Sequence, residues 1–122
     1  MKFEKILEEI DYNPRNYLQE VRQRAKKNKY NPDDVSFSDN MKNKLMIRDP
    51  NGKNVYFGLS GYGDFLIYKH LEREGIAPAG TAEKKRNTFQ RSHGQLQKNI
   101  QARKKGSDLK YTPNQLALLL NW

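Results

Sequence analysis

The sequence predicts an α+β fold, a single small domain in which a central β-hairpin over about residues 44–59 is packed by roughly five α-helices. Three observations predict it. Two stretches rich in β-forming residues flank the turn sequence Asp49-Pro50-Asn51-Gly52. Apolar residues recur at helical spacing on both sides of that hairpin. The chain has 122 residues, of which 35% are hydrophobic, and this is enough for one domain with a modest core.

Two helices are expected before the hairpin. Apolar residues at helical spacing predict a short first helix over Lys2–Ile10. Asn13-Pro14 is a typical helix start, because Asn caps the first turn and Pro has no N–H to leave unpaired there. The second helix is expected to run to about Asn28. We expect one domain over residues 1–122, with its core formed by residues 34–122. Residues 1–30 are expected to be a helical segment, either part of the domain or an extension of it.

The hairpin and the helix after it follow from local signals. The strands are expected over Lys44–Arg48 and Asn54–Leu59, which are rich in β-forming residues. The glycine-rich stretch Gly58–Asp64 matches neither the dinucleotide-binding pattern nor the P-loop, so we interpret it as a tight turn between strand and helix. Asp64 is expected to cap a largely apolar helix over Phe65–Glu74.

Two further helices are expected in the last third of the chain. After the connector Gly75–Gly80, a long basic helix is expected over about Thr81–Lys104, with Ser92-His93-Gly94 as a candidate break in its middle. Thr112-Pro113 repeats the combination of cap and proline and starts a last, almost wholly apolar helix.

The charge of the chain is concentrated in two segments. The formal net charge is +9, and residues 13–30 carry +5 while 76–122 carry +7. A neutral middle between two basic segments indicates a negatively charged partner, although charge can also serve solubility alone. The chain has no cysteine, which excludes disulfides and thiolate zinc sites. The first residues lead into an acidic amphipathic stretch and no apolar run reaches about 18 residues, so we expect neither a signal peptide nor a membrane span.

The basic helix has two distinct faces. At about 100° per residue, cations that recur every seven positions share one stripe and are about 10.5 Å apart. These cations are Lys84, Arg91, Lys98 and Lys105. The residues expected on the opposite, packing face are Phe89, His93, Leu96 and Ile100. Polar side chains able to bond phosphate or base edges lie beside the stripe and are Asn87, Thr88, Gln95, Asn99 and Gln101.

The stripe predicts contact with a polyanion. Phosphate contact without base readout is the favoured mechanism, and the lack of aromatic residues on the basic face argues against a platform that stacks single-stranded bases. Two other uses of the stripe stay open at the level of the sequence. The stripe would be a solvated helix face, or it would dock on an acidic protein such as a capsid subunit. The candidate polyanion-binding residues come from both basic segments and are Arg15, Arg22, Lys26, Lys29, Lys84, Lys85, Arg86, Arg91, Lys98, Arg103, Lys104 and Lys105.

Signals for catalysis are weak in this chain. His93 lies among the apolar residues of the basic helix and is expected to be a partly buried packing residue, and His70 has no other histidine at metal spacing. The carboxylates Asp33, Asp34 and Asp64 are scattered along the sequence, although they are free to converge in space. We therefore expect no catalytic residue, no metal, no cofactor and no enzyme activity.

Four phrases of the sequence occur in an order that resembles a known group of proteins. They are Lys44–Ile47, Phe57–Phe65, Lys84–Gly94 and Tyr111–Ala117, and the last is followed by Leu120-Asn121-Trp122. The chain resembles, over roughly Asp34–Trp122, small, basic, mostly uncharacterised proteins of large double-stranded DNA viruses of protists and algae and their relatives.

The resemblance implies a viral protein carried in the virion and assembled in the cytoplasm or nucleus of a host cell. It makes Gly58, Gly61, Tyr62 and Asp64 a structural signature of the turn, and Trp122 a residue that locks the core. It implies that the basic helix faces packaged DNA or the inside of a shell. The insert around Ala77–Thr81 departs from the pattern and bears on where that helix points.

The function expected from the sequence is that of a non-enzymatic, virion-associated structural protein. It would contact nucleic acid through the phosphate backbone, link capsid components through their acidic surfaces, or do both, and oligomer formation stays open. One alternative is an intracellular DNA- or RNA-binding regulator, which would need base readout and a dimer. A less favoured alternative is a metal-dependent nuclease that uses loop carboxylates and His93.

Overall fold

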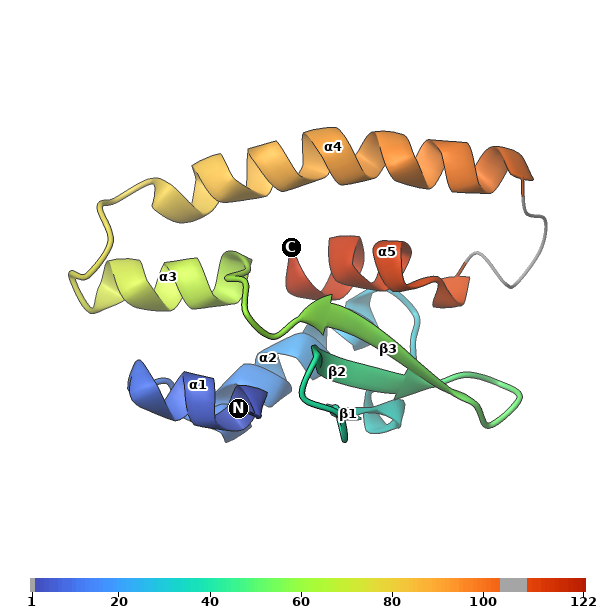
Figure 1. Ribbon diagram of the computed structural model, residues 1–122, viewed down its shortest axis with the longest axis horizontal. Coiled ribbons are helices and arrows are strands. Elements are labelled where there is room, and N and C mark those ends of the chain that lie inside the picture. Colours follow the sequence, from blue (N-terminus) through green and yellow to red (C-terminus); the bar gives the residue numbers. More distant parts are fainter. Residues whose placement is uncertain (1, 104–109) are drawn as a thin grey trace. The chain divides into compact units, whose positions relative to one another are not determined.

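The computed structural model describes residues 2–103 and 110–122, and its elements combine helices with one antiparallel sheet (Figure 1). This confirms the predicted α+β class. The chain forms two compact units, Met1–Tyr62 and Gly63–Trp122, which are described in turn. The elements in chain order are α1 (Phe3–Glu9), α2 (Pro14–Lys27), a 3-10 turn (Pro32–Asp34), β1 (Val35–Phe37), β2 (Asn43–Arg48), β3 (Asn54–Leu59), α3 (Phe65–Arg73), α4 (Thr81–Arg103), α5 (Pro113–Leu116) and a π-helical turn (Ala117–Asn121) that continues α5.

The sheet of the first unit is built on the predicted hairpin. β2 and β3 pair antiparallel with Leu45 opposite Phe57, and both strands agree with the predicted bounds to within one residue. The turn is closed by the Asp49 carboxylate, which accepts hydrogen bonds from the backbone N–H groups of Asn51 and Lys53. Gly52 takes the positive φ of 79° that such a turn requires. A third strand that the sequence did not predict, β1, pairs with β2 at the other edge.

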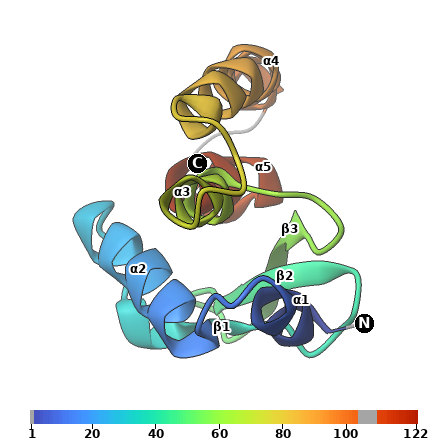
Figure 2. The same ribbon diagram turned by 90° about the vertical axis from the view of Figure 1, so that its left-hand side faces the viewer.

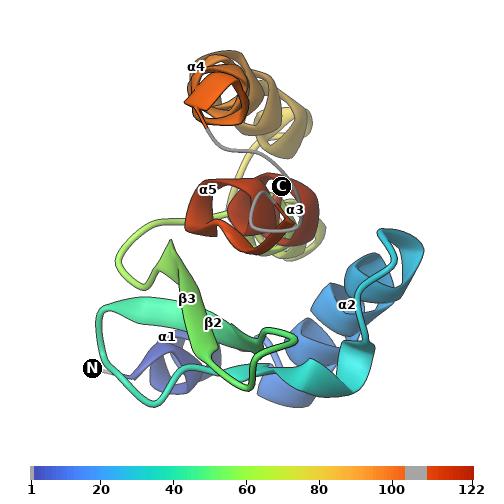
Figure 3. The same ribbon diagram turned by 90° about the vertical axis from the view of Figure 1, so that its right-hand side faces the viewer.

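Aromatic side chains form much of the core of this unit. The ring of Tyr17 on α2 contacts Phe3 edge-on at 5.0 Å between centroids and stacks on Phe37 of β1 at 6.4 Å. Tyr17, Val21 and Ala25 of α2 are fully buried, while their helix lies beside β1 (Figures 2 and 3). The two N-terminal helices therefore pack with the sheet through a shared set of apolar residues.

Three helices end in the same way, with one residue in the left-handed conformation. At the end of α3, the N–H of Gly75 bonds Glu72 and that of Ile76 bonds Leu71, which is the Schellman arrangement. Gly75 has the positive φ of 72° that this motif needs. The same two bonds close α1 and α2, but there the left-handed residues are Asp11 and Lys29, with φ of 56° and 67°. Side chains with a Cβ thus occupy positions that favour glycine.

The second unit contains α3, α4 and α5, and α4 runs alongside both of the others (Figure 1). The predicted caps are confirmed: Asp64 accepts the N–H of Ile67 at the start of α3, and Thr112 accepts the N–H of Gln115 at the start of α5. Gly63 precedes the first cap because the ring of Tyr68 covers its Cα, so that a Cβ there would lie 2.7 Å from the ring. Local sequence signals therefore set where the short helices of this unit begin.

Candidate nucleic-acid interface

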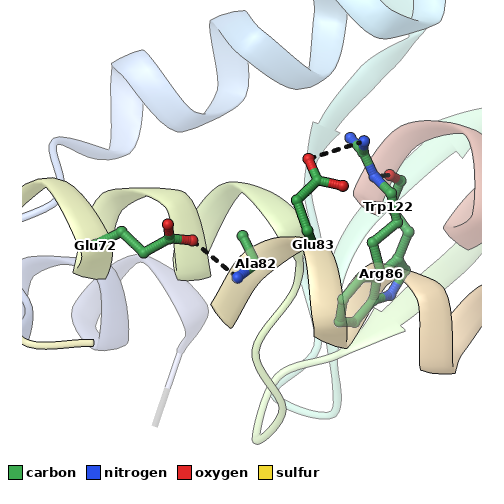
Figure 4. A network of polar contacts seen from close by, with 5 residues as sticks. All are labelled: Glu72, Ala82, Glu83, Arg86 and Trp122. Atoms are coloured by element: carbon green, nitrogen blue, oxygen red, sulfur yellow. Dashed lines mark hydrogen bonds and ion pairs between the residues drawn. The ribbon is translucent and has the colours of Figure 1, made fainter. Parts of the chain in front are cut away.

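The N-terminus of α4 is held by a carboxylate from α3. Glu72 accepts a hydrogen bond from the backbone N–H of Ala82 at 2.8 Å (Figure 4) and a second one from the backbone N–H of Gly80 at 2.9 Å. The first N–H groups of a helix have no partner within the helix and carry partial positive charge, so a carboxylate is favoured there. The same two bonds hold the pKa of Glu72 below its ordinary value of 4.5. Glu72 therefore fixes where α4 begins.

Arg86 provides a second attachment one turn further along α4. Its Nε donates to the backbone oxygen of Trp122 at 3.0 Å (Figure 4). Its guanidinium lies 3.4 Å above the ring of Phe65. Glu83 lies 3.8 Å from the same guanidinium as an ion-pair partner. Arg86 thus joins α3, α4 and the end of the chain. Its planar group is held by the contact with the Phe65 ring and by the hydrogen bond to Trp122.

The packing face of α4 carries a stack of three rings. Trp122 lies 4.6 Å from Phe89 between centroids, and Phe89 lies 3.7 Å from His93, in both cases nearly parallel. Nδ1 of His93 is 3.2 Å from the carbonyl of Phe89, and the ring is half-buried, so the expected packing role of this histidine is confirmed. The two rings on α4 thus orient this helix face toward the end of the chain.

The prediction of the packing face was wrong for one residue, Leu96. Leu96 is 47% exposed, whereas Gln97 is buried and accepts a hydrogen bond from Nδ2 of Asn114 at 3.0 Å. The same amide donates to the carbonyl of His93, so Asn114 of α5 binds two successive turns of α4. This contact rotates the centre of the packing face toward Gln97, and Leu96 turns out to the solvent. No pattern within α4 alone indicates that rotation.

The opposite face of α4 is exposed and basic, as its spacing predicted. The exposed residues that follow each other along this face at intervals of three and four are Lys84, Thr88, Arg91, Gln95 and Lys98. The helix passes through Ser92-His93-Gly94 without interruption, so the candidate break there does not occur. Lys84, Arg91 and Lys98 therefore form one continuous cationic ridge on a rigid element, and successive cations advance about 10.5 Å along the axis.

None of the three ridge cations has its charge engaged elsewhere among the described residues. Neither an ion pair nor a side-chain hydrogen bond is formed by Lys84, Arg91 or Lys98 with residues 2–100 or 110–122. Lys85, which is also exposed, lies beside the ridge with its Nζ 5.6 Å from the ring centre of Tyr68. The cationic ridge, defined as Lys84, Arg91 and Lys98, is thus available to a negatively charged ligand.

No family model, no curated protein and no solved structure matches this chain.

The other predicted binding residues fall into three groups. Arg15, Lys26 and Lys29 are exposed on or just after α2. Arg22 is half-buried, and its Nε and Nη2 both donate to the carbonyl of Val35, at 3.0 and 2.8 Å, so it joins α2 to β1 as Arg86 joins α4 to Trp122. We leave Arg22 and Arg86 out of the interface for that reason. Arg103 lies in the last turn of α4, and Lys104 and Lys105 lie outside the described residues.

The structure also places the residues considered for catalysis. Asp64 is fully buried, where its carboxylate caps α3 and accepts a hydrogen bond from Asn121. In the parts of the chain that the structure describes, no cluster of three or more His, Asp or Glu is arranged to hold a metal ion. A helix long and apolar enough to cross a membrane is likewise not found among those residues.

Sequence reasoning missed the residues that position the interface. Glu72 reaches the start of α4 from eight and ten residues away, and Arg86 reaches an oxygen 36 residues away. A cap supplied by the preceding helix has no sequence signature like that of Asn13 or Thr112, which bond their own first turn. Only the high density of charge around residues 83–86 marked the region.

Proposed function

We propose that this protein is a non-enzymatic nucleic-acid-binding protein that contacts the phosphate backbone through the cationic ridge of α4. The observation that carries the proposal is the disposition of Lys84, Arg91 and Lys98. All three are exposed, lie opposite the packing face and are without a charged partner among the described residues. Cations in a row on a rigid helix can each replace a counterion of a nucleic acid, which makes binding favourable and dependent on salt.

The composition of the second unit supports the same proposal. Residues 63–122 contain eleven basic and five acidic residues, and the 23-residue α4 has six basic residues and a single acidic one, Glu83. Glu83 is directed to Arg86, away from the ridge. A polyanion that approaches the ridge therefore meets no carboxylate of α4 there.

The setting that we propose is a virion, and its support is the sequence resemblance described above. A basic helix that binds phosphates would suit packaged DNA. Contact with acidic surfaces of capsid proteins is the competing use of the same cations, and the experiment below distinguishes the two.

The proposal is tested by binding to a random-sequence DNA duplex over a series of salt concentrations. The variant Lys84→Gln/Arg91→Gln/Lys98→Gln is compared with a control of equal net charge, Lys5→Gln/Lys42→Gln/Lys53→Gln, whose three side chains are also exposed. We expect the ridge variant to lower the slope of log K against log salt by about 2.7, since each phosphate contact contributes about 0.9. The control should keep most of the wild-type slope.

Circular dichroism and thermal unfolding establish that both variants remain folded. Equal slopes for the ridge variant and the control would contradict the proposal, because binding would then follow net charge and not the ridge. Failure of the wild-type protein to bind the duplex even at low salt would also contradict it, and would direct the search to acidic capsid proteins.

A further inference from the structure

A second row of exposed side chains runs along α4 beside the cationic ridge, and its members are uncharged. At about 100° per residue, this row lies about 20–80° around the helix axis from Lys84. Lys85, at about 100°, borders it on the other side. We call this row the amide ridge, and it consists of Thr88, Ser92, Gln95 and Asn99. The outward face of α4 thus has cations at both edges and neutral polar groups between them.

The two amides of this row are joined to each other. Nε2 of Gln95 donates to Oδ1 of Asn99 at 3.4 Å, which links side chains one turn apart on the exposed surface. The bond leaves Oε1 of Gln95 as an acceptor and Nδ2 of Asn99 as a donor, neither engaged by another described residue. The pair therefore presents one acceptor and one donor in a partly fixed arrangement.

The two hydroxyl groups of the row bond to the helix itself. Oγ1 of Thr88 donates to the carbonyl of Lys84 at 3.1 Å, and Oγ of Ser92 lies 3.3 Å from the carbonyl of Thr88. Because both hydroxyl protons are donated to carbonyls of the helix, these hydroxyl groups do not offer a donor to a ligand. The directed hydrogen-bonding groups that the amide ridge offers to a ligand are consequently the acceptor of Gln95 and the donor of Asn99.

We propose that the amide ridge reads base edges in the major groove of duplex DNA, with α4 lying in the groove. This inference rests on the proposed function and names its ligand. Asn and Gln side chains match adenine, which offers a donor at N6 and an acceptor at N7 in the major groove. The free acceptor of Gln95 and the free donor of Asn99 are complementary to that pair.

The distribution of charge over the face fits a groove better than a flat polyanion. A helix with its side chains is about 10–12 Å across, and the major groove of B-DNA is about 12 Å wide. In that position the cationic ridge meets one phosphate strand, the amides face the bases, and Lys85, whose Nζ lies 5.6 Å from the ring centre of Tyr68, is on the side of the other strand. The major groove of duplex RNA is too deep and narrow for this arrangement, which favours DNA.

The inference is tested by selecting duplexes from a randomised DNA pool with the wild-type protein, then comparing a selected duplex with a scrambled one. We expect the wild type to prefer the selected duplex by about 5- to 150-fold, the range for one good bidentate contact. The variant Gln95→Ala/Asn99→Ala should bind both duplexes within about twofold of each other. Its salt slope should equal that of the wild type, because no cation has been removed.

A matched control is available on the same helix. Asn87 and Gln90 are also one Asn and one Gln, both exposed, but they lie outside the amide ridge. The variant Asn87→Ala/Gln90→Ala should therefore retain the preference for the selected duplex. Equal loss in this control and in the Gln95→Ala/Asn99→Ala variant would overturn the inference.

Failure of the inference can be distinguished from failure of the proposed function. A steep salt slope with no enriched sequence would overturn base readout and leave phosphate binding standing. Equal affinity for the selected sequence as duplex RNA would likewise overturn the assignment to the DNA major groove. Absence of any duplex binding at low salt would overturn both.

Discussion

Arg22 and Arg86 each bind a backbone oxygen that lies far away in the sequence. Arg22 donates twice to the carbonyl of Val35, and Arg86 donates once to Trp122 while its guanidinium covers the ring of Phe65. A hydrogen bond from a charged donor contributes about 1.5–3 kcal/mol in proteins, more than a surface ion pair does. At the scale of the residue, these two arginines stabilise the fold, while the exposed cations of α4 are free to act on a ligand.

Replacing Arg86 by lysine should destabilise the protein although the charge is kept. Lysine has no planar group to cover Phe65 and no Nε–H to reach the oxygen of Trp122 in the same geometry. We expect the free energy of unfolding to fall by about 1–2 kcal/mol, measured by urea denaturation. Arg91→Lys on the exposed face of the same helix should change it by less than about 0.5 kcal/mol. Similar values for both variants would contradict the role assigned to Arg86.

The carboxylate of Glu72 should make stability depend on pH in the acid range. Its pKa in the folded protein is lowered from 4.5 by the N–H groups of Ala82 and Gly80, so the unfolded chain binds this proton more readily. The contribution is therefore present above pH 4.5 and is lost as pH falls through the lowered pKa. We expect the wild type to be more stable than Glu72→Gln at neutral pH, with the difference shrinking below pH 4.5.

Urea denaturation of the two proteins between pH 7 and pH 3 provides the measurement. Glu74→Gln removes the same charge from the exposed residue two positions further on and serves as the control. A stability difference between wild type and Glu72→Gln that stays constant down to pH 3 would show that the carboxylate does not act through its charge.

At the scale of the element, the ends of α1, α2 and α3 show how one motif tolerates different residues. All three helices close with the same pair of backbone bonds, yet only α3 has glycine at the left-handed position. A residue with a Cβ costs roughly 1–2 kcal/mol in that conformation. At the ends of α1 and α2 the next residues, Tyr12 and Tyr30, are buried, and their burial stabilises both turns despite the strain.

Lys29→Gly should accordingly stabilise the protein. Lys29 has a φ of 67°, and glycine adopts this conformation without a steric penalty. The matched comparison is Lys29→Ala, which removes the same charge and keeps the Cβ. We expect the glycine variant to exceed the alanine variant by about 1 kcal/mol in free energy of unfolding, measured in urea. If alanine proved equal or better, the strain assigned to this turn would be absent.

The elements differ in how well the sequence predicted them. Helix starts at Asn13, Asp64 and Thr112 and the hairpin turn at Asp49 were predicted because each is closed by a side chain within a few residues. β1 was missed, since three residues carry too little periodicity and depend on pairing with β2. The rotation of α4 that buries Gln97 was missed for the same kind of reason, because Asn114 sets it from α5.

At the scale of the whole molecule, the two halves share the net charge unequally. Residues 1–62 contain twelve basic and nine acidic residues, so most of the net charge of +9 belongs to residues 63–122. On α2 the exposed cations are Arg15 near its start and Lys26 and Lys27 at its end, about 16 Å further along the axis, and Arg22 between them is bonded to Val35. The exposed cations of α2 therefore form no evenly spaced row like the cationic ridge.

Neutralising Arg15, Lys26 and Lys29 of the first unit should accordingly affect binding less than neutralising the cationic ridge. For Arg15→Gln/Lys26→Gln/Lys29→Gln we expect the salt slope with a DNA duplex to fall by less than about 1, against about 2.7 for the ridge variant. Both are measured in the same salt series. An equal fall for both variants would mean that the two basic segments hold the same polyanion.

The candidate interface was predicted in outline and corrected in detail. Heptad spacing was sufficient to place Lys84, Arg91 and Lys98 on one exposed face, because that property depends on helix geometry alone. It could not show that Arg22 and Arg86 have partners 13 and 36 residues away. Charge identifies where a polyanion would bind, but tertiary contacts decide which charges remain available for it.

The division of labour between the two faces of α4 has a consequence for engineering. Everything that anchors the helix, from Glu72 at its first turn to Asn114 at its middle, contacts the backbone or the packing face. The exposed positions between residues 84 and 98 can therefore be randomised in a display library with little expected cost to folding. New ligand specificities could then be engineered by substituting exposed residues of one helix while the rest of the chain stays unchanged.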